Sequence, residues 1–273
     1  MDANSYLVTE LIDAGLNRRE ARWLVEEFSP DNPEAIAAMR VAAQRRLDGE
    51  PIQYVLGHWP FRSLDLELDR RVLIPRPETE ELVGLAFDEL MQRSLKEPLI
   101  VDLGCGSGAI GLSLLFELRQ LGVHATLVAV DSSRDALDVT RANAAKHGLE
   151  GVTTVHSSWF EALDESLLGR VDLIVANPPY VGAAEFATLD PVLGYEPLGA
   201  LVSEDTVRAE GFLDLEVIIG QSCAWLAPNG LLICEHGNMH RAPILQSAHD
   251  AMFADVKDLD DMFGNPRFLI AKR

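Results

Sequence analysis

The sequence predicts an α/β protein in which a small helical N-terminal domain precedes a mostly parallel sheet with helices on both faces. Three observations support this class. From Pro75 onward, short apolar runs typical of buried strands alternate with stretches of helical length and spacing. Residues 5–46 instead show only helical spacing of their apolar positions. Near the end, strand-like segments flank Gly264-Asn265-Pro266, which predicts an antiparallel hairpin that closes the sheet.

The N-terminal segment is predicted to form helices over residues 5–28, with one interruption, and over 33–46. The apolar positions of the first stretch are Leu7, Leu11, Leu16, Trp23 and Leu24. Asn32 or Asp31 can cap the second helix, because Pro33 is favoured in a first helical turn. We therefore predict a helical N-terminal domain over residues 1–53.

A linker is predicted over residues 54–75, before the α/β domain of residues 76–273. Leu64, Leu66 and Leu68 alternate with charged residues. This period of two indicates a half-exposed strand, which we assign to a β-hairpin.

The α/β domain alternates strands with helices, an order that favours parallel strand pairing. The predicted strands lie near Leu99, Thr126, Val152, Val171 and Leu231, and the predicted helices span Glu78 to Met91, Arg134 to His147 and Phe212 to Leu226. The closing hairpin is predicted from 254–259 and 267–272.

A glycine-rich loop follows the strand at residues 98–103 and leads into a helix from Ala109. The loop consists of Gly104, Cys105, Gly106, Ser107 and Gly108. Glycines permit positive φ and let a ligand lie against the backbone, and helix N-terminal amides then face it. Asp131 ends the next apolar run, at a distance that suits a carboxylate bound to ribose hydroxyls. The sequence therefore predicts a nucleotide-type cofactor site.

Two cofactor classes fit this loop. Residues 106–111 match the G-x-G-x-x-G pattern of dinucleotide sites. Asp102, however, completes the spacing D-x-G-x-G-x-G, which resembles the first motif of S-adenosylmethionine-dependent methyltransferases. The loop alone does not distinguish a dinucleotide site from an S-adenosylmethionine site. A second motif favours S-adenosylmethionine.

That second motif is Asn177-Pro178-Pro179-Tyr180, at the carboxyl end of the predicted strand near Val171. Ligands of open α/β sheets bind at this edge. The prolines remove two N–H donors, so the exposed polar groups are mainly acceptors, which suits a planar NH2 group. Asn177 Oδ1 and the Pro178 carbonyl would each accept one N–H and orient the nitrogen toward an electrophile, while Tyr180 stacks on the flat group. Methyl transfer to nitrogen uses such a pocket, and hydride transfer does not.

Composition narrows the partners and the compartment. The 273 residues carry a formal net charge of -20, which disfavours duplex nucleic acid as a direct partner. Three widely spaced cysteines give no disulfide framework or zinc pattern, and we expect no metal. Neither a secretory signal nor an apolar run of about 20 residues is present, so we expect a cytoplasmic protein without membrane contact. The acidic cluster Asp258, Asp260 and Asp261 is interpreted as solvated edge charge.

Several segments in order resemble the HemK/PrmC family of peptide chain release factor glutamine methyltransferases. These segments are Gly49 to Tyr54, Ile74 to Glu80, Asp102 to Gly108, Asn177 to Tyr180, and Glu196-Pro197. The resemblance implies the class I S-adenosylmethionine-dependent methyltransferase fold, which is Rossmann-like. It further implies methyl transfer from S-adenosylmethionine, giving S-adenosylhomocysteine, to the glutamine amide nitrogen in the Gly-Gly-Gln loop of class I release factors.

The family's site residues carry over by position. Residues 104–108 would underlie the methionine part of the cofactor, Asp131 would hold the ribose and Trp159 would lie near the adenine. Asn177, Pro178, Pro179 and Tyr180 would grip the glutamine, with Asn177 also near the cofactor.

One departure from the family is the sequence Glu235-His236-Gly237, where relatives usually carry Glu-Ile-Gly. It leaves the role of Glu235 open, like that of residues 76–80, which are expected to line the site mouth. Methylation of a ribosomal-protein glutamine or of adenine in DNA, and a catalytically silent nucleotide-binding scaffold, are the alternative readings.

Overall fold

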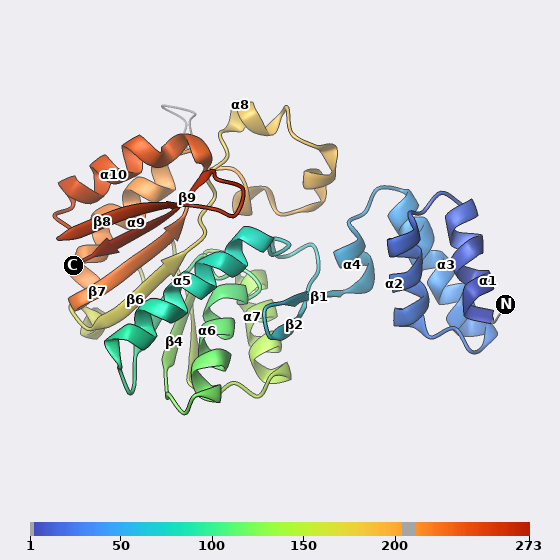
Figure 1. Cartoon of the computed structure of the whole chain (residues 1–273), viewed down its shortest axis with the longest axis horizontal. Coiled ribbons are helices and arrows are strands. Elements are labelled where there is room, and N and C mark those ends of the chain that lie inside the picture. Colours follow the sequence, from blue (N-terminus) through green and yellow to red (C-terminus); the bar gives the residue numbers. More distant parts are fainter. Residues whose placement is uncertain (1–2, 204–210) are drawn as a thin grey trace.

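The computed structural model describes residues 3–203 and 211–273. In Figure 1 a group of N-terminal helices stands beside a large sheet, and a short helix and a hairpin connect the two parts. The N-terminal helices are α1 (Ala3–Asp13), α2 (Arg18–Phe28), α3 (Pro33–Leu47) and α4 (Ile52–Leu56). The hairpin consists of β1 (His58–Phe61) and β2 (Leu64–Glu67).

The α/β part contains the predicted alternation. Its strands are β3 (Leu99–Leu103), β4 (Thr126–Asp131), β5 (Val152–His156), β6 (Val171–Ala176), β7 (Leu226–Glu235), β8 (Asp255–Asp260) and β9 (Pro266–Lys272). Its helices are α5 (Pro77–Arg93), α6 (Ala109–Gln120), α7 (Arg134–Lys146), α8 (Ala183–Phe186), α9 (Leu213–Trp225) and α10 (Arg241–Asp250). Short 3-10 turns are η1 (Glu165–Leu167), η2 (Pro191–Tyr195), η3 (Leu198–Ala200) and η4 (Asn238–His240).

The strands form one seven-stranded sheet in the order β5-β4-β3-β6-β7-β9-β8. The first five strands of this order pair in parallel, whereas β9 pairs antiparallel with both β7 and β8. The predicted mostly parallel sheet with a C-terminal antiparallel hairpin is therefore confirmed. The strand expected near Leu231 begins earlier, at Leu226, directly after α9.

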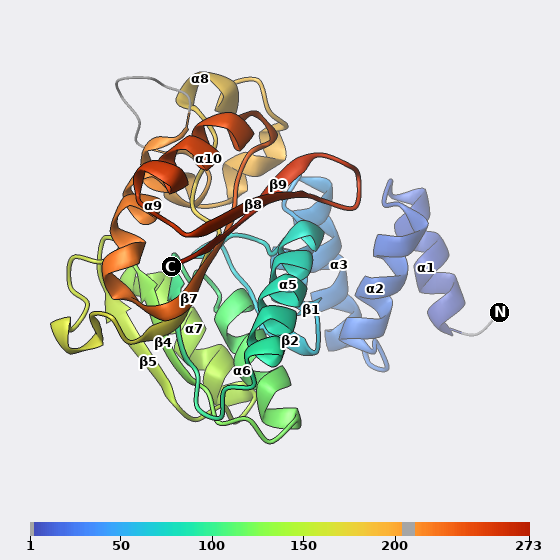
Figure 2. The same ribbon diagram turned by 60° about the vertical axis from the view of Figure 1, so that its left-hand side comes forward.

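Helices cover both faces of this sheet, as the turned view in Figure 2 shows. Alternate strand residues supply the two faces because strand side chains point up and down in turn. Ile100 and Leu173 pack on the face covered by α5, α6 and α7. Their neighbours Val101 and Ile174 pack on the opposite face, with α9 and α10. The buried strands thus read as continuous apolar runs, as parallel strands covered on both faces do.

The N-terminal helices have an apolar cluster of their own. Its buried residues come from α1 to α4 and include Leu24, Met39 and Val55. The predicted boundary after residue 53 falls inside α4, a helix that the sequence patterns did not predict. The division into residues 1–53, 54–75 and 76–273 stays a prediction.

The β1–β2 hairpin is fastened to the helices of the α/β part. Arg62 forms a two-point ion pair with Glu117 of α6, with 2.7 Å between nitrogen and oxygen in each bond. Asp65 accepts a hydrogen bond from Lys146 of α7 at 2.8 Å. On the other side, His58 Nε2 lies 3.0 Å from the Glu27 carboxylate of α2. The hairpin is therefore the bridge between the N-terminal helices and the sheet.

The acidic cluster near the C-terminus is not solvated edge charge, apart from the half-exposed Asp260. The carboxylate of Asp258 is buried between His236 and Arg241. Asp261 is buried too, and it accepts the backbone N–H groups of Phe263 and Asn265 at 2.9 and 3.0 Å. The prediction was wrong because the charges organise the β8–β9 turn and its surroundings.

Across the described ranges 3–203 and 211–273, we find no helix long and apolar enough to cross a membrane.

Candidate active site

The sheet register brings the two sequence motifs together. Leu103 at the end of β3 pairs with Ala176 at the end of β6, so the glycine loop and Asn177 leave the sheet side by side. Ala176 in turn pairs with Cys234 of β7, which places Glu235 next to Asn177. The chain order reverses between β3 and β6, and such a switch point is where open α/β sheets bind ligands.

The glycine loop turns sharply at this edge, with its glycines at positive φ. Gly108 has φ 82°, and a Cβ added there would lie 2.6 Å from Leu112 Cδ1, so any other residue would be strained and would push the Leu112 side chain aside. Gly106 has φ 54° and an added Cβ would meet nothing within 4 Å. A backbone this open on its outer side is suited to a ligand lying against it.

Cys105 and Ser107 contribute backbone rather than side chains to the loop, since both side chains are buried. The Cys105 sulfur lies 3.4 Å from Thr140 Oγ1, and burial raises the pKa of its thiol well above the ordinary value. The Ser107 carbonyl accepts a hydrogen bond from Asn143 at 2.9 Å. Both interactions fix the loop to α7.

Asp131 ends β4 beside the loop. One carboxylate oxygen accepts the Gly106 N–H at 2.9 Å and the other accepts the Ser133 N–H at 2.8 Å. Burial raises its pKa, while these backbone hydrogen bonds oppose the rise. The side chain thus holds the loop, and each oxygen keeps a second lone pair with which a carboxylate can bind hydroxyl groups.

Asp102, inside β3, has a buried carboxylate. Its Oδ2 accepts the Gly111 N–H at 2.9 Å, in the first turn of α6 rather than within the loop. Its Oδ1 has no hydrogen-bond partner among the described residues. Burial raises the pKa of Asp102 to about 7. An orphaned acceptor of this kind beside a glycine loop fits a ligand that carries a cationic group.

Trp159, after β5, lies on the other side of the loop. Its indole N–H donates to Asp214 of α9 at 3.1 Å. A Cβ added at Gly104 would lie 3.4 Å from the six-membered ring of Trp159, so the ring packs against the first loop residue. The sequence-predicted cofactor residues are thus gathered around one loop.

The Asn177 side chain belongs to a buried polar network that the sequence motifs did not reveal. Its Nδ2 donates to Thr79 Oγ1 at 3.1 Å, and Thr79 donates to Glu235 Oε2 at 2.8 Å. The Tyr180 hydroxyl donates to Glu235 Oε1 at 3.1 Å. Tyr180 is therefore tied by its hydroxyl to β7. The network leaves Asn177 Oδ1 directed away from Thr79.

Three of its members, Thr79, Glu235 and Arg267, were missed as site residues. Thr79 lies within residues 76–80, and Glu235 lies in the segment Glu235-His236-Gly237, which departs from the family pattern. The sequence assigned no definite role to either residue. Arg267 of β9 lies 3.5 Å from the Tyr180 hydroxyl and 3.1 Å from the His236 carbonyl. His236 itself turns away, with Nε2 2.7 Å from Asp258.

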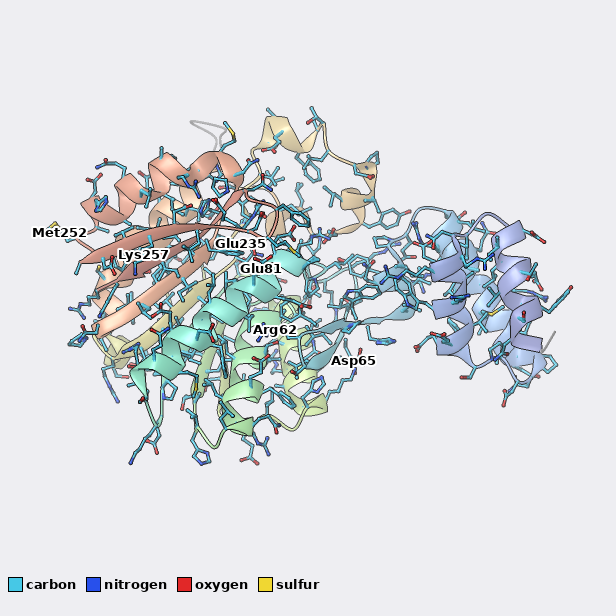
Figure 3. All side chains as sticks on the ribbon, in the orientation of Figure 1. Arg62, Asp65, Glu81, Glu235, Met252 and Lys257 are labelled. Carbon is cyan, nitrogen blue, oxygen red and sulfur yellow. The ribbon has the colours of Figure 1, made fainter. Side chains whose placement is uncertain are left out.

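The segment before α5 is anchored by Glu196, from the motif Glu196-Pro197. Glu196 accepts the Ile74 N–H at 2.9 Å and an Arg76 guanidinium N–H at 2.5 Å. This places residues 74–80 at the edge where Asn177 lies. Figure 3 labels Glu81, near the start of α5, and Glu235, at the end of β7.

Chemically, the edge has two parts. One is a backbone cradle with carboxylates for a hydroxyl-rich, cationic cofactor. The other is an amide oxygen held next to it. No cluster of three or more metal-binding side chains is found within the described part of the chain.

Comparisons with known proteins place this site in a family. Residues 86–189 match the model of the methyltransferase small domain. A release factor glutamine methyltransferase from Pasteurella multocida is 38% identical over 82% of this chain and 76% of its own length. A human protein called MTRF1L release factor glutamine methyltransferase is 34% identical over 100% of this chain and 81% of its own length.

Solved structures confirm the fold. A T. thermophilus 16S rRNA N2 G1207 methyltransferase, solved with AdoMet and guanosine, matches with a TM-score of 0.54 at 19% identity, over 79% of this chain and 49% of that chain. A ribosomal protein L11 methylase from Lactobacillus delbrueckii matches with a TM-score of 0.50 at 22% identity, over 72% of this chain and 80% of that chain. The fold is that of class I S-adenosylmethionine-dependent methyltransferases, and the chain belongs to the release factor glutamine methyltransferase family.

Proposed function

We propose that this protein transfers a methyl group from S-adenosylmethionine to the side-chain amide nitrogen of the glutamine in the Gly-Gly-Gln loop of class I release factors. The names of its relatives point to this substrate. The observation that carries the proposal is the pairing of Leu103 with Ala176, which sets the glycine loop beside Asn177. A cofactor on the loop and an amide at Asn177 are then neighbours.

The residues present fit S-adenosylmethionine. The orphaned Oδ1 of Asp102 complements a cationic amino group, and Asp131 has lone pairs for ribose hydroxyls. Gly104 to Gly108 hold the methionine part, and Trp159 flanks the adenine. Bound there, the cofactor supplies an electrophilic methyl group, and no metal is needed for that chemistry.

The chain's own task is to present a weak nucleophile. A carboxamide nitrogen is a poor nucleophile because its lone pair is delocalised. Asn177 Oδ1 and the Pro178 carbonyl accept its two N–H groups and so set its orientation, while Tyr180 and Pro179 confine the flat group. The nitrogen becomes acidic as it is alkylated and loses its proton to water, so the pocket needs acceptors rather than a strong base.

The surroundings of the site suit a protein substrate. Four large apolar side chains are exposed on segments at the carboxyl edge of the sheet: Leu198, Met239, Met262 and Phe263. Leu198 lies in η3, Met239 in η4 and the last two in the β8–β9 turn. Exposed apolar groups gathered around a site mark a protein interaction surface. The end of α3 lies next to η2, where the Tyr195 hydroxyl donates to the Asp48 carbonyl at 3.1 Å, and we assign the N-terminal helices to recognition of the release factor in the cytoplasm.

The proposal is tested with labelled S-adenosylmethionine and three acceptors: a purified class I release factor, its Gly-Gly-Ala variant and a DNA duplex. We expect label only on the intact factor, at the glutamine. Label on the variant would move the target elsewhere in the protein. Label on DNA, or on a ribosomal protein added in competition, would replace the proposed substrate.

A further inference from the structure

A chain of buried hydrogen bonds runs behind Asn177, from β7 through α5 to the end of β6. Glu235 and Thr79 are 1% and 4% exposed. Thr79 Oγ1 lies 2.8 Å from Glu235 Oε2 and 3.1 Å from Asn177 Nδ2. The Thr79 hydroxyl is therefore the link between a buried carboxylate and the amide that faces the target.

The direction of these hydrogen bonds follows from the chemistry of the groups. An ionised carboxylate only accepts, and a hydroxyl has a single proton to donate. One oxygen of Glu235 accepts from Tyr180 and the other from Thr79. Since the Thr79 proton is committed to Glu235, its oxygen must accept from Asn177. Only the NH2 end of the amide can make that bond, so Oδ1 is left for the pocket.

The opposite orientation of the amide would defeat the pocket. A rotation by 180° would turn the Asn177 oxygen toward the Thr79 oxygen and the NH2 toward the target NH2. The Asn177 NH2 and the target NH2, both donors, would then face each other in the pocket. On the other side the Asn177 and Thr79 oxygens, both acceptors, would face each other, and each pair would leave a buried polar group without a partner. The polarity of the pocket thus depends on the hydrogen bond that Thr79 donates to Glu235, a residue that does not touch the substrate.

The groups around Glu235 come from α5, from the segment after β6 and from β9. Burial raises the pKa of its carboxyl, whereas Thr79, Arg267 and Tyr180 act in the opposite direction and Glu78 adds to the rise. Arg267 provides the nearby positive charge, 3.5 Å from the Tyr180 hydroxyl.

We propose that Thr79 and Glu235 are positioning residues that lock the Asn177 amide with its oxygen toward the target nitrogen. The proposal rests on the proposed function for the meaning of that orientation, but not for the orientation itself. It assigns roles to Glu235 and to Thr79 of residues 76–80, which the sequence left open.

The kinetic test compares Thr79→Val, Thr79→Ser and Glu235→Gln with the wild type. Valine keeps the shape of threonine and removes the hydroxyl, so we expect kcat to fall about 10- to 100-fold, the range for leaving one buried partner unpaired. Serine restores the hydroxyl and should recover most of that loss. Glutamine can donate to Thr79 and so reverse the chain of bonds, and we expect a loss at least as large. Cofactor affinity, measured by calorimetry, should change less than threefold in all three.

A control variant is Thr126→Val, at the exposed first residue of β4 and so at the opposite edge of the sheet from Asn177. It makes the same chemical change away from the site and from the N-terminal helices, and turnover should stay within the error of the wild type. Equal losses of kcat in Thr79→Val and Thr79→Ser would overturn the proposal. So would losses explained by weaker cofactor binding or by a lower melting temperature.

A second measurement is independent of turnover. In protein labelled with 15N-asparagine, the side-chain NH2 signal of Asn177 is assigned by its absence in Asn177→Ser. We expect one of its protons to exchange slowly in the wild type and in Thr79→Ser, and rapidly in Thr79→Val. Identical exchange in all three would refute the lock. If the wild type passes this test but labels no release factor, the proposed function fails while the orientation stands.

Discussion

The two halves of the site are built in different ways. The cofactor half is mostly backbone: one stretch, residues 102–108, supplies its turn, and Asp131 from the neighbouring strand braces it at 2.9 Å. The target half is made of side chains from α5, the segment after β6, β7 and β9, and the Asn177–Thr79 contact spans 98 positions of sequence. A site made of backbone depends on glycines and can be recognised from one short stretch of sequence. A side-chain network depends on strand register, and one altered atom can reverse its polarity.

The largest expected effect lies in the target half. Asn177→Ala removes the acceptor that orients the nitrogen, and we expect kcat to fall by about 100- to 1,000-fold, as when an oriented hydrogen-bond group is lost from an active site. Cofactor affinity should change far less, because the loop half is untouched. Steady-state kinetics on the release factor and calorimetry with the cofactor separate the two. Equal losses in both would erase the distinction between the halves.

The same contrast explains what the sequence could predict. The glycine loop, Asp131 and Asn177 stand out because each comes directly after an apolar run, and parallel strands end at a common edge. The parallel pairing of most strands and the positions of α5, α6, α7 and α9 followed from the alternation of apolar runs with stretches of helical spacing. The location of the loop, Asp131 and Asn177 at one edge of the sheet could thus be predicted without tertiary information.

Thr79, Glu235 and Arg267 could not be found in this way. Thr79 lies in the first turn of α5, a position that carries no sign of what it faces. The pairing of Ala176 with Cys234, which brings Glu235 next to Asn177, depends on a register that apolar runs do not specify. The burial of Asp258 and Asp261 was missed for the same reason, since their partners Arg241 and Arg267 come from other segments.

In the cofactor half, Asp131→Ala should weaken cofactor binding by about 1.5 to 3 kcal/mol, the range for hydrogen bonds to a charged group. Part of the loss comes through the loop, because the Gly106 and Ser133 amides lose their acceptor. At saturating cofactor, kcat should remain within a few-fold of the wild type. Calorimetry gives the affinity, and unchanged binding would remove Asp131 from the cofactor site.

The cofactor half also predicts a pH dependence of stability. The folded pKa of Asp102, about 7, lies above the ordinary value of about 4. The folded state therefore binds more protons than the unfolded state between these values. This contribution to stability is fully present below about pH 4 and is lost as pH rises through about 7.

We expect the free energy of unfolding of the cofactor-free protein to fall by about 1 to 2 kcal/mol more between pH 5 and pH 7 in the wild type than in Asp102→Asn. Glu235, whose raised pKa has other causes, affects both proteins alike and cancels in the difference. Asp131 does not cancel fully, because its charge is one of the causes of the raised pKa of Asp102. Urea denaturation at several pH values measures the effect. Parallel curves for the two proteins would mean that the buried Asp102 carboxylate costs nothing to ionise.

The smallest expected effect concerns the rim of the target half. Met262 and Phe263 are about 70% exposed, on a turn that Asp261 holds and that bonds to Glu81 of α5. Because this turn is fixed, its apolar side chains are ready to bind without a cost in ordering. Replacing both with serine should raise KM for the release factor about three- to tenfold and leave kcat and cofactor affinity unchanged. A short Gly-Gly-Gln peptide, too small to reach the rim, should show no change in KM.

The matched control is Met252→Ser, since Met252 is 84% exposed but lies at the far end of the sheet from Glu235 (Figure 3). An equal rise in KM from that control would mean that apolar exposure anywhere on the protein, rather than the rim of the target half, sets the affinity for the substrate.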